Sequence, residues 1–137
     1  MHRILHRARD QRGAAAVEMA IVLPILILLI FGIVEFSIVF NRLQGLQAAA
    51  REGARVAALP QSTQSDIRAK VTSALSGVLP TTQSPVITVS PASGNPCDLR
   101  AADARVVVTV KANTELDIPL WGSQTVTLTG KGEFKCE

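Results

Sequence analysis

The feature that most constrains the fold is a long apolar stretch near the N-terminus. Residues 19–34 contain no charged side chain, and the stretch as a whole covers residues 14–40, interrupted only by Glu18, Glu35 and small residues. As one helix, residues 14–40 would be about 40 Å long, which exceeds the ~30 Å hydrocarbon core of a bilayer. The stretch therefore predicts a helix that spans a membrane.

The uncharged part begins at Met19 and ends at Val34, and Pro24 lies inside it. Proline has no backbone N–H, so the carbonyl of Ala20 would lack its helical partner. We therefore expect a kink or a local loosening of the helix at Pro24. A carboxylate at the end of a membrane-spanning segment is energetically unfavourable, so the position of Glu18 needs an explanation.

Positive charge is concentrated at the N-terminal end. Residues 1–13 carry four arginines and one aspartate, a formal charge of +3, which is also the net charge of the whole chain. The remaining residues are neutral overall, so they offer no basic cluster for nucleic acid. Basic flanks of membrane helices stay in the cytoplasm. The pattern therefore predicts a single pass through the cytoplasmic membrane, with the N-terminus inside and the C-terminal part outside.

Small residues continue the helix beyond the apolar stretch. A glycine or an alanine recurs every four residues along one face, at Gly45, Ala49, Gly53 and Ala57. Each glycine destabilises a helix by about 1 kcal/mol relative to alanine, which favours a face that another backbone approaches closely. An ordinary alanine-rich helix is the alternative. Pro60 ends the pattern, so the long helix is predicted to cover residues 14–59.

Residues 60–137 predict a small head, which makes the chain α+β. A short amphipathic helix is expected after Pro60, at residues 65–77. β-branched runs then predict short strands separated by turns, at residues 86–89, 105–110 and 125–129, with 131–136 as a candidate for a last strand. The expected fold is a long N-terminal membrane-spanning helix, a short amphipathic helix and a small antiparallel β-sheet. The single tryptophan, Trp121, is expected in the core, with an exposed anchor as the alternative.

Two cysteines, Cys97 and Cys136, lie on the C-terminal side of the apolar stretch. In the predicted topology this side faces an oxidising compartment, so we expect a disulfide between them, with two buried thiols as the alternative. In the chain-entropy model, closing the loop between Cys97 and Cys136 would add roughly 4 kcal/mol to the free energy of unfolding. Both histidines lie within residues 1–13, so a metal site at the cysteines is not expected.

The chain offers little for catalysis. It has no tyrosine, and no histidine outside residues 1–13. Glu18 and Glu35 would lie about 25 Å apart along one helix, so they cannot share a substrate or a metal. We therefore predict that the protein is not an enzyme and has no catalytic residues, cofactor site or metal site.

Four segments together resemble a known family. They are residues 13–20 (GAAAVEMA), 22–24 (VLP), 31–36 (FGIVEF) and 49–58 (AAREGARVAA). As a set they resemble the TadE-like proteins, which are minor pilins or pseudopilins of tight-adherence (Flp-type) pilus systems. Met19 stands where the major pilins of these systems prefer tyrosine, and the chain is longer than those pilins. Both departures argue against a major filament subunit.

The resemblance implies that residues 1–13 are a prepilin leader, which a prepilin peptidase removes between Gly13 and Ala14. Glu18 would then be the fifth mature residue and could pair with the new amine of a neighbouring subunit, because an opposite charge makes burial tolerable. The implied partners are the prepilin peptidase, other minor pilins, the major Flp-type pilin, a membrane assembly platform and the lipid bilayer. The implied role is assembly of a pilus for surface attachment, with the protein held in the cytoplasmic membrane or incorporated in the pilus.

Two other interpretations remain open from the sequence. A non-pilin, single-pass membrane-anchored binding module would keep residues 1–13 and present its head outside the membrane. A secreted soluble domain would be released at the A-x-A site of residues 48–50. Against secretion, the apolar stretch is longer than a usual signal sequence, and polar residues separate it from this site.

Overall fold

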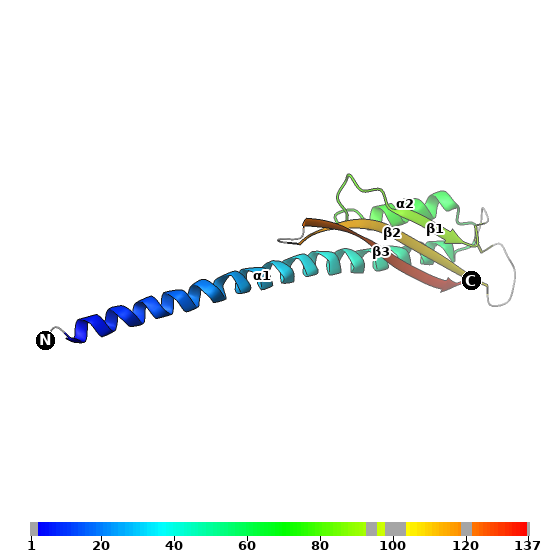
Figure 1. Cartoon of the computed structure of the whole chain (residues 1–137). Helices are drawn as coiled ribbons and strands as arrows, with labels where there is room; N and C mark the ends of the chain where they lie inside the picture. The colour runs from blue at the N-terminus through cyan, green and yellow to red at the C-terminus, as the bar shows by residue number, and fades with distance from the viewer. Residues whose placement is uncertain (1–2, 93–95, 98–103, 119–121, 137) are drawn as a thin grey trace.

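The computed structural model describes residues 3–92, 96–97, 104–118 and 122–136, with side chains from residue 13 onward. Figure 1 shows one long helix, α1, with all other elements gathered at its C-terminal end. The elements are α1 (Arg3–Ala57), α2 (Gln64–Ala74), β1 (Val86–Ser90), β2 (Arg105–Ile118) and β3 (Gly122–Lys135). The predicted α+β class is therefore confirmed. Trp121 lies outside the described residues.

Helix α1 is longer than the sequence suggested. It begins at Arg3 rather than at residue 14, and it ends at Ala57, two residues before the predicted end. Residues 3–12 consist largely of good helix formers, so the backbone shows no break at Gly13. The helix also continues through Pro24, and Figure 1 shows one gradual curve rather than the expected kink. The fixed φ of proline lies in the helical range, so the missing hydrogen bond does not interrupt the helix.

Helix α2 begins with a capping box. The Thr63 side chain accepts a hydrogen bond from the backbone N–H of Asp66, while the Asp66 carboxylate accepts one from the backbone N–H of Thr63 at 3.1 Å. The Thr63 hydroxyl also donates to the Asp66 carboxylate at 2.6 Å, and this bond, together with the one from the Thr63 backbone N–H, holds the pKa of Asp66 below its usual value. The helix ends at Ala74, three residues before the predicted end. Gly77 follows with a φ of +82°, a conformation that favours glycine, so the chain turns there.

The sheet is a three-stranded antiparallel meander in the order β1-β2-β3. β2 and β3 form a long hairpin that is paired from Arg105 opposite Lys135 to Ile118 opposite Gly122. Both strands are longer than the predicted ones. The segment 131–136, considered as a separate last strand, is the continuation of β3 through Gly130 and Gly132.

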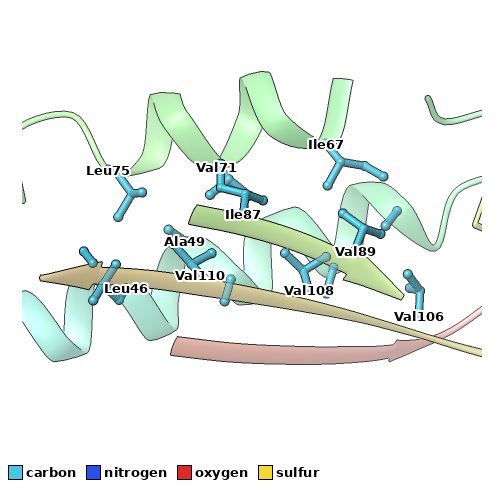
Figure 2. Close-up of a cluster of buried hydrophobic side chains, with 14 of the residues drawn as sticks. Leu46, Ala49, Ile67, Val71, Leu75, Ile87, Val89, Val106, Val108 and Val110 are labelled. Carbon is cyan, nitrogen blue, oxygen red and sulfur yellow. The ribbon is translucent and has the colours of Figure 1, made fainter. Parts of the chain in front are cut away.

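One face of the sheet packs against the C-terminal part of α1 and against α2, and the sheet and the two helices enclose the core between them (Figure 2). Alternate residues of β2 point into it, so that Val106, Val108 and Val110 have no exposed surface. The opposite face of the sheet carries mostly polar side chains and is open to solvent. In Figure 2 the labelled side chains of α2 point down towards those of β1 and α1, as the period of the predicted amphipathic helix requires.

Two glycines of β3 allow a close approach between the backbones of β3 and α1. A Cβ atom added at Gly130 would overlap the carbonyl of Leu46, and one added at Gly132 would overlap the carbonyl of Ala50. Glycine weakens a strand unless another backbone comes near, so these two positions bring α1 directly onto the sheet. The alternation Gly-Lys-Gly at residues 130–132 is the sequence signal for this contact.

Side chains from other elements cover the row of small residues on α1, which consists of Gly45, Ala49, Gly53 and Ala57. Ala49 and Ala57 have no exposed surface. A Cβ added at Gly53 would overlap the Val71 side chain, and one added at Gly45 would overlap that of Val78. These positions therefore pack inside the head against side chains, among them those of α2 and of the turn that follows it, and not against a second backbone. The backbone approach falls on the neighbouring row of the helix, at Leu46 and Ala50.

We expect Gly132→Ala to destabilise the head by roughly 1–3 kcal/mol, because the new methyl group must displace the α1 backbone rather than a flexible side chain. Urea unfolding of the full chain in mild detergent, followed by circular dichroism, measures the change. Gly32→Ala is the matched control, since a Cβ there meets nothing within 4 Å. Equal unfolding midpoints for both variants would show that α1 and β3 are not in close contact.

Candidate functional site

Residues 13–34 of α1, called the rod below, form an apolar helical segment that no other part of the described structure covers. Every residue from 13 to 34 is exposed, including Ile21, Leu26 and Phe31. Burying one such side chain is worth about 1.5–3 kcal/mol, so an uncovered rod of this kind is unstable in water. The helix Gly13–Ala57 is long and apolar enough to cross a membrane, and its most apolar part is not buried. The helix is therefore compatible with a single-pass membrane anchor.

The anchor and the head share one helix, and Glu35 lies at the boundary. Glu35 is the first half-buried residue along α1, and Val39, Leu43 and the fully buried Leu46 follow it on the same face. Residues 14–34 are therefore exposed along their whole length in the part of the chain that the structure describes, and at 1.5 Å per residue they span about 32 Å. This length matches the hydrocarbon core of a bilayer.

Gly13, Ala14 and Glu18 lie together on consecutive turns of the exposed rod. Ala14 and Glu18 are four residues apart in a continuous helix, so both side chains lie on one face. A Cβ at Gly13 would meet nothing within 4 Å. Neither packing nor a turn therefore requires glycine at this position, although glycine weakens a helix. Glu18 is exposed and lies about 25 Å from Glu35 along the axis, so the structure does not bring the two carboxylates together.

The A-x-A site considered for secretion is part of the core. Ala49 and Ala50 have no exposed surface and lie in the middle of α1. Cleavage after Ala50 would separate Leu46 and both alanines from the head that they pack against. The fold therefore argues against release of the head as an ordinary secreted domain.

The predicted disulfide is present at the end of the head farthest from the rod. Cys97 and Cys136 are bonded, with their Cα atoms 5.5 Å apart. The backbone N–H of Cys136 also donates to the carbonyl of Ala104 at 2.9 Å. The bond ties the end of β3 to the segment that precedes β2. Within the described residues, no group of three or more His, Cys, Asp or Glu side chains could hold a metal ion.

A small charge cluster lies on the open face of the sheet. Glu133 contacts Arg105 at 3.1 Å and Lys131 at 3.7 Å. The hydrogen bond from Arg105 and the positive charge of Lys131 lower the pKa of the Glu133 carboxyl. Its contribution to stability is complete above the ordinary glutamate pKa and is lost as the pH falls through the lowered value. All three side chains are well exposed, so the contribution is small.

These features define a class of protein. Its long helix is apolar and exposed in the N-terminal part, and the C-terminal part of the same helix is built into a small disulfide-bonded α+β head. The model of the TadE-like protein family matches residues 13–55. This match confirms the resemblance to TadE-like proteins over the rod and the first part of the helix that enters the head. No curated protein and no solved structure matches the chain.

Replacing both Cys97 and Cys136 by serine should lower the free energy of unfolding of the head by about 4 kcal/mol, because the unfolded chain gains the freedom of an open loop. Denaturant unfolding of the full chain with and without reductant measures this. Reductant should shift the midpoint of the natural chain towards that of the variant and leave the variant unchanged. A natural chain that is insensitive to complete reduction would contradict the expected stabilisation.

Proposed function

We propose that this chain is a minor pilin or pseudopilin of a tight-adherence pilus. It inserts in the cytoplasmic membrane, is processed after Gly13, and supports assembly of the pilus for surface attachment. The TadE-like match indicates a protein associated with such pilus machinery. The observation that carries the finer proposal is the rod itself: an exposed apolar helix with one carboxylate, Glu18, a single turn beyond Ala14.

The rod suits two environments. Its side chains are exposed on all sides from residue 13 to residue 34, so either lipid or the helices of neighbouring subunits can surround it. Both surroundings are apolar, so the free energy of an apolar side chain such as Ile21 or Phe31 changes little when neighbouring helices replace lipid. Glu18 is the exception, because a carboxylate leaving the membrane surface for a helical assembly needs a positive partner. Removal of residues 1–13 would supply one, as the free amine of Ala14 of a neighbouring subunit.

The topology follows from charge. The basic segment 1–13 stays in the cytoplasm within reach of a membrane prepilin peptidase, and the head lies outside, where its disulfide is stable. The other proposed partners are further minor pilins, the major Flp-type pilin and the membrane assembly platform. The proposed role is structural rather than enzymatic: the head presents a folded surface, and the rod carries the assembly contacts.

Processing tests the first step. The mature protein should begin at Ala14, and Gly13→Leu should block cleavage while leaving membrane insertion intact, because the peptidase must accommodate the residue before the cut. N-terminal sequencing and intact mass give the answer. Gly32→Leu is the matched control, since Gly32 has equally open surroundings, and it should be processed normally. A natural chain that begins at Met1 would instead indicate an anchored binding module, and one that begins at Arg51 would indicate ordinary secretion.

Assembly tests the role of Glu18. As the only copy in the cell, Glu18→Gln should be inserted and cleaved normally but should reduce surface pili and co-purification of partner pilins at least tenfold, since the pairing charge is lost. Glu35→Gln is the control, because Glu35 lies about 25 Å further along the helix than Glu18 and therefore not beside the new amine. Normal piliation by a fully processed Glu18→Gln protein would remove the charge-pair mechanism.

A further inference from the structure

The core of the head is not closed at the end that faces the rod. Along the inner face of β2, exposure rises from Thr114 at 0% to Ile118 at 41%, with Leu116 half-buried between them. On β3 it rises from Leu128 at 7% to Val126 at 40%. The apolar layer between sheet and helix therefore continues past the enclosed core towards the end of the hairpin.

On α1, beneath this end of the hairpin, the exposure of the apolar side chains also rises towards the rod. Leu46 is fully buried, Leu43 and Val39 are half-buried, and Phe36 is 69% exposed. A core that ends in water is usually bordered by polar residues. Here Val126 lies opposite Thr114, and the inner positions nearer the end of the hairpin are Leu116 opposite Gln124 and Ile118 opposite Gly122, so Gln124 is the one polar side chain among them. The surface is therefore continuous with the apolar rod.

The end of the hairpin reaches the level at which the rod begins. Gly130 lies over Leu46 and Gly132 over Ala50, so β3 and α1 point in the same direction. From Gly130 back to Gly122 the strand covers about 26 Å, which corresponds to at most ~17 residues of helix. The strand is inclined to α1, and in Figure 1 the end of β2 and the start of β3 lie over the middle of the helix. This level is close to Glu35, which is the first half-buried residue.

We propose that this end of the β2–β3 hairpin docks in the interfacial layer of the phospholipid bilayer, where lipid completes the open core around Leu116, Ile118 and Val126. The inference rests on the proposed function only in requiring that α1 spans a membrane. If residues 14–34 occupy the hydrocarbon core, Glu35 lies at the interface, and the hairpin end lies at the same depth. The bilayer is the favoured occupant because it already surrounds the adjoining rod.

Docking would fix the head relative to the membrane. A head joined to the bilayer only by α1 could tilt with the helix, whereas a second contact beside the helix holds the open face of the sheet at a set angle. The contact must also be given up when the subunit leaves the membrane for a pilus. The apolar hairpin end would then require cover from a neighbouring subunit.

Tryptophan fluorescence in brominated phosphatidylcholine vesicles tests the proposal. Trp121 is the only tryptophan, and tyrosine is absent, so its emission reports on the connection between Ile118 and Gly122. Bromine atoms placed shallow in the acyl chains should quench Trp121 at least twofold, and more strongly than deep ones. Two variants in a Trp121→Phe background are the controls. Phe31→Trp on the rod should be quenched, and Phe134→Trp at the opposite end of the hairpin should not.

The controls separate the possible failures. Quenching of Phe31→Trp without quenching of Trp121 would overturn the docking and leave the anchor intact, whereas an unquenched Phe31→Trp would overturn both. A Trp121 that is shielded from bromolipid and also from aqueous iodide would show a protein neighbour instead, which overturns the lipid proposal. Val126→Asp should reduce Trp121 quenching at least twofold, while Val86→Asp, an exposed position on β1, should not. Intact disulfide and helix content confirm that both variants fold.

Discussion

The backbone contact between α1 and β3 is the interaction on which the rest of the structure depends. Gly130 and Gly132 let the strand lie directly on the carbonyls of Leu46 and Ala50. This approach suits the small side chain of Ala50, which is fully buried, while Leu46 at the other contact is a large side chain that is also fully buried. A bulkier residue at either glycine would lift the sheet from the helix and open the core, since interiors are packed to crystal-like density.

Because of this contact, one helix belongs to two structures. The C-terminal third of α1 is the centre of the head core, where it meets α2 and the sheet, whereas residues 13–34 are exposed throughout. No flexible linker separates the two parts, because α1 is continuous from Arg3 to Ala57. A displacement or rotation of the rod is therefore passed to the head directly. In the proposed pilus, the packing of rods would set the positions of the heads.

Glu18, Glu35 and Gly13 are three positions of the exposed part of α1 and its boundary that apolar burial does not explain. Glu18 lies one turn from Ala14, in a segment that nothing in the fold covers. Glu35 lies where the first contacts with the head begin. Gly13 has open space around it and serves neither packing nor a turn, so its reason lies outside the folded chain. In the function proposed here, this open position would suit a peptidase that needs a small residue before the cut.

The sequence by itself determined the membrane-compatible helix, the class of the fold and the cysteine pairing. These depend on local properties: uninterrupted apolar length, β-branched runs, and two cysteines on the same side of the apolar stretch. Only the tertiary structure decided the extent of the strands and the place of close packing. Gly130 and Gly132 weaken a strand locally, and they remain within β3 because the α1 backbone lies against them. The open end of the core was likewise decided by tertiary structure, since the depth of Ile118 and Val126 depends on how the hairpin lies along the helix, and no local pattern encodes that alignment.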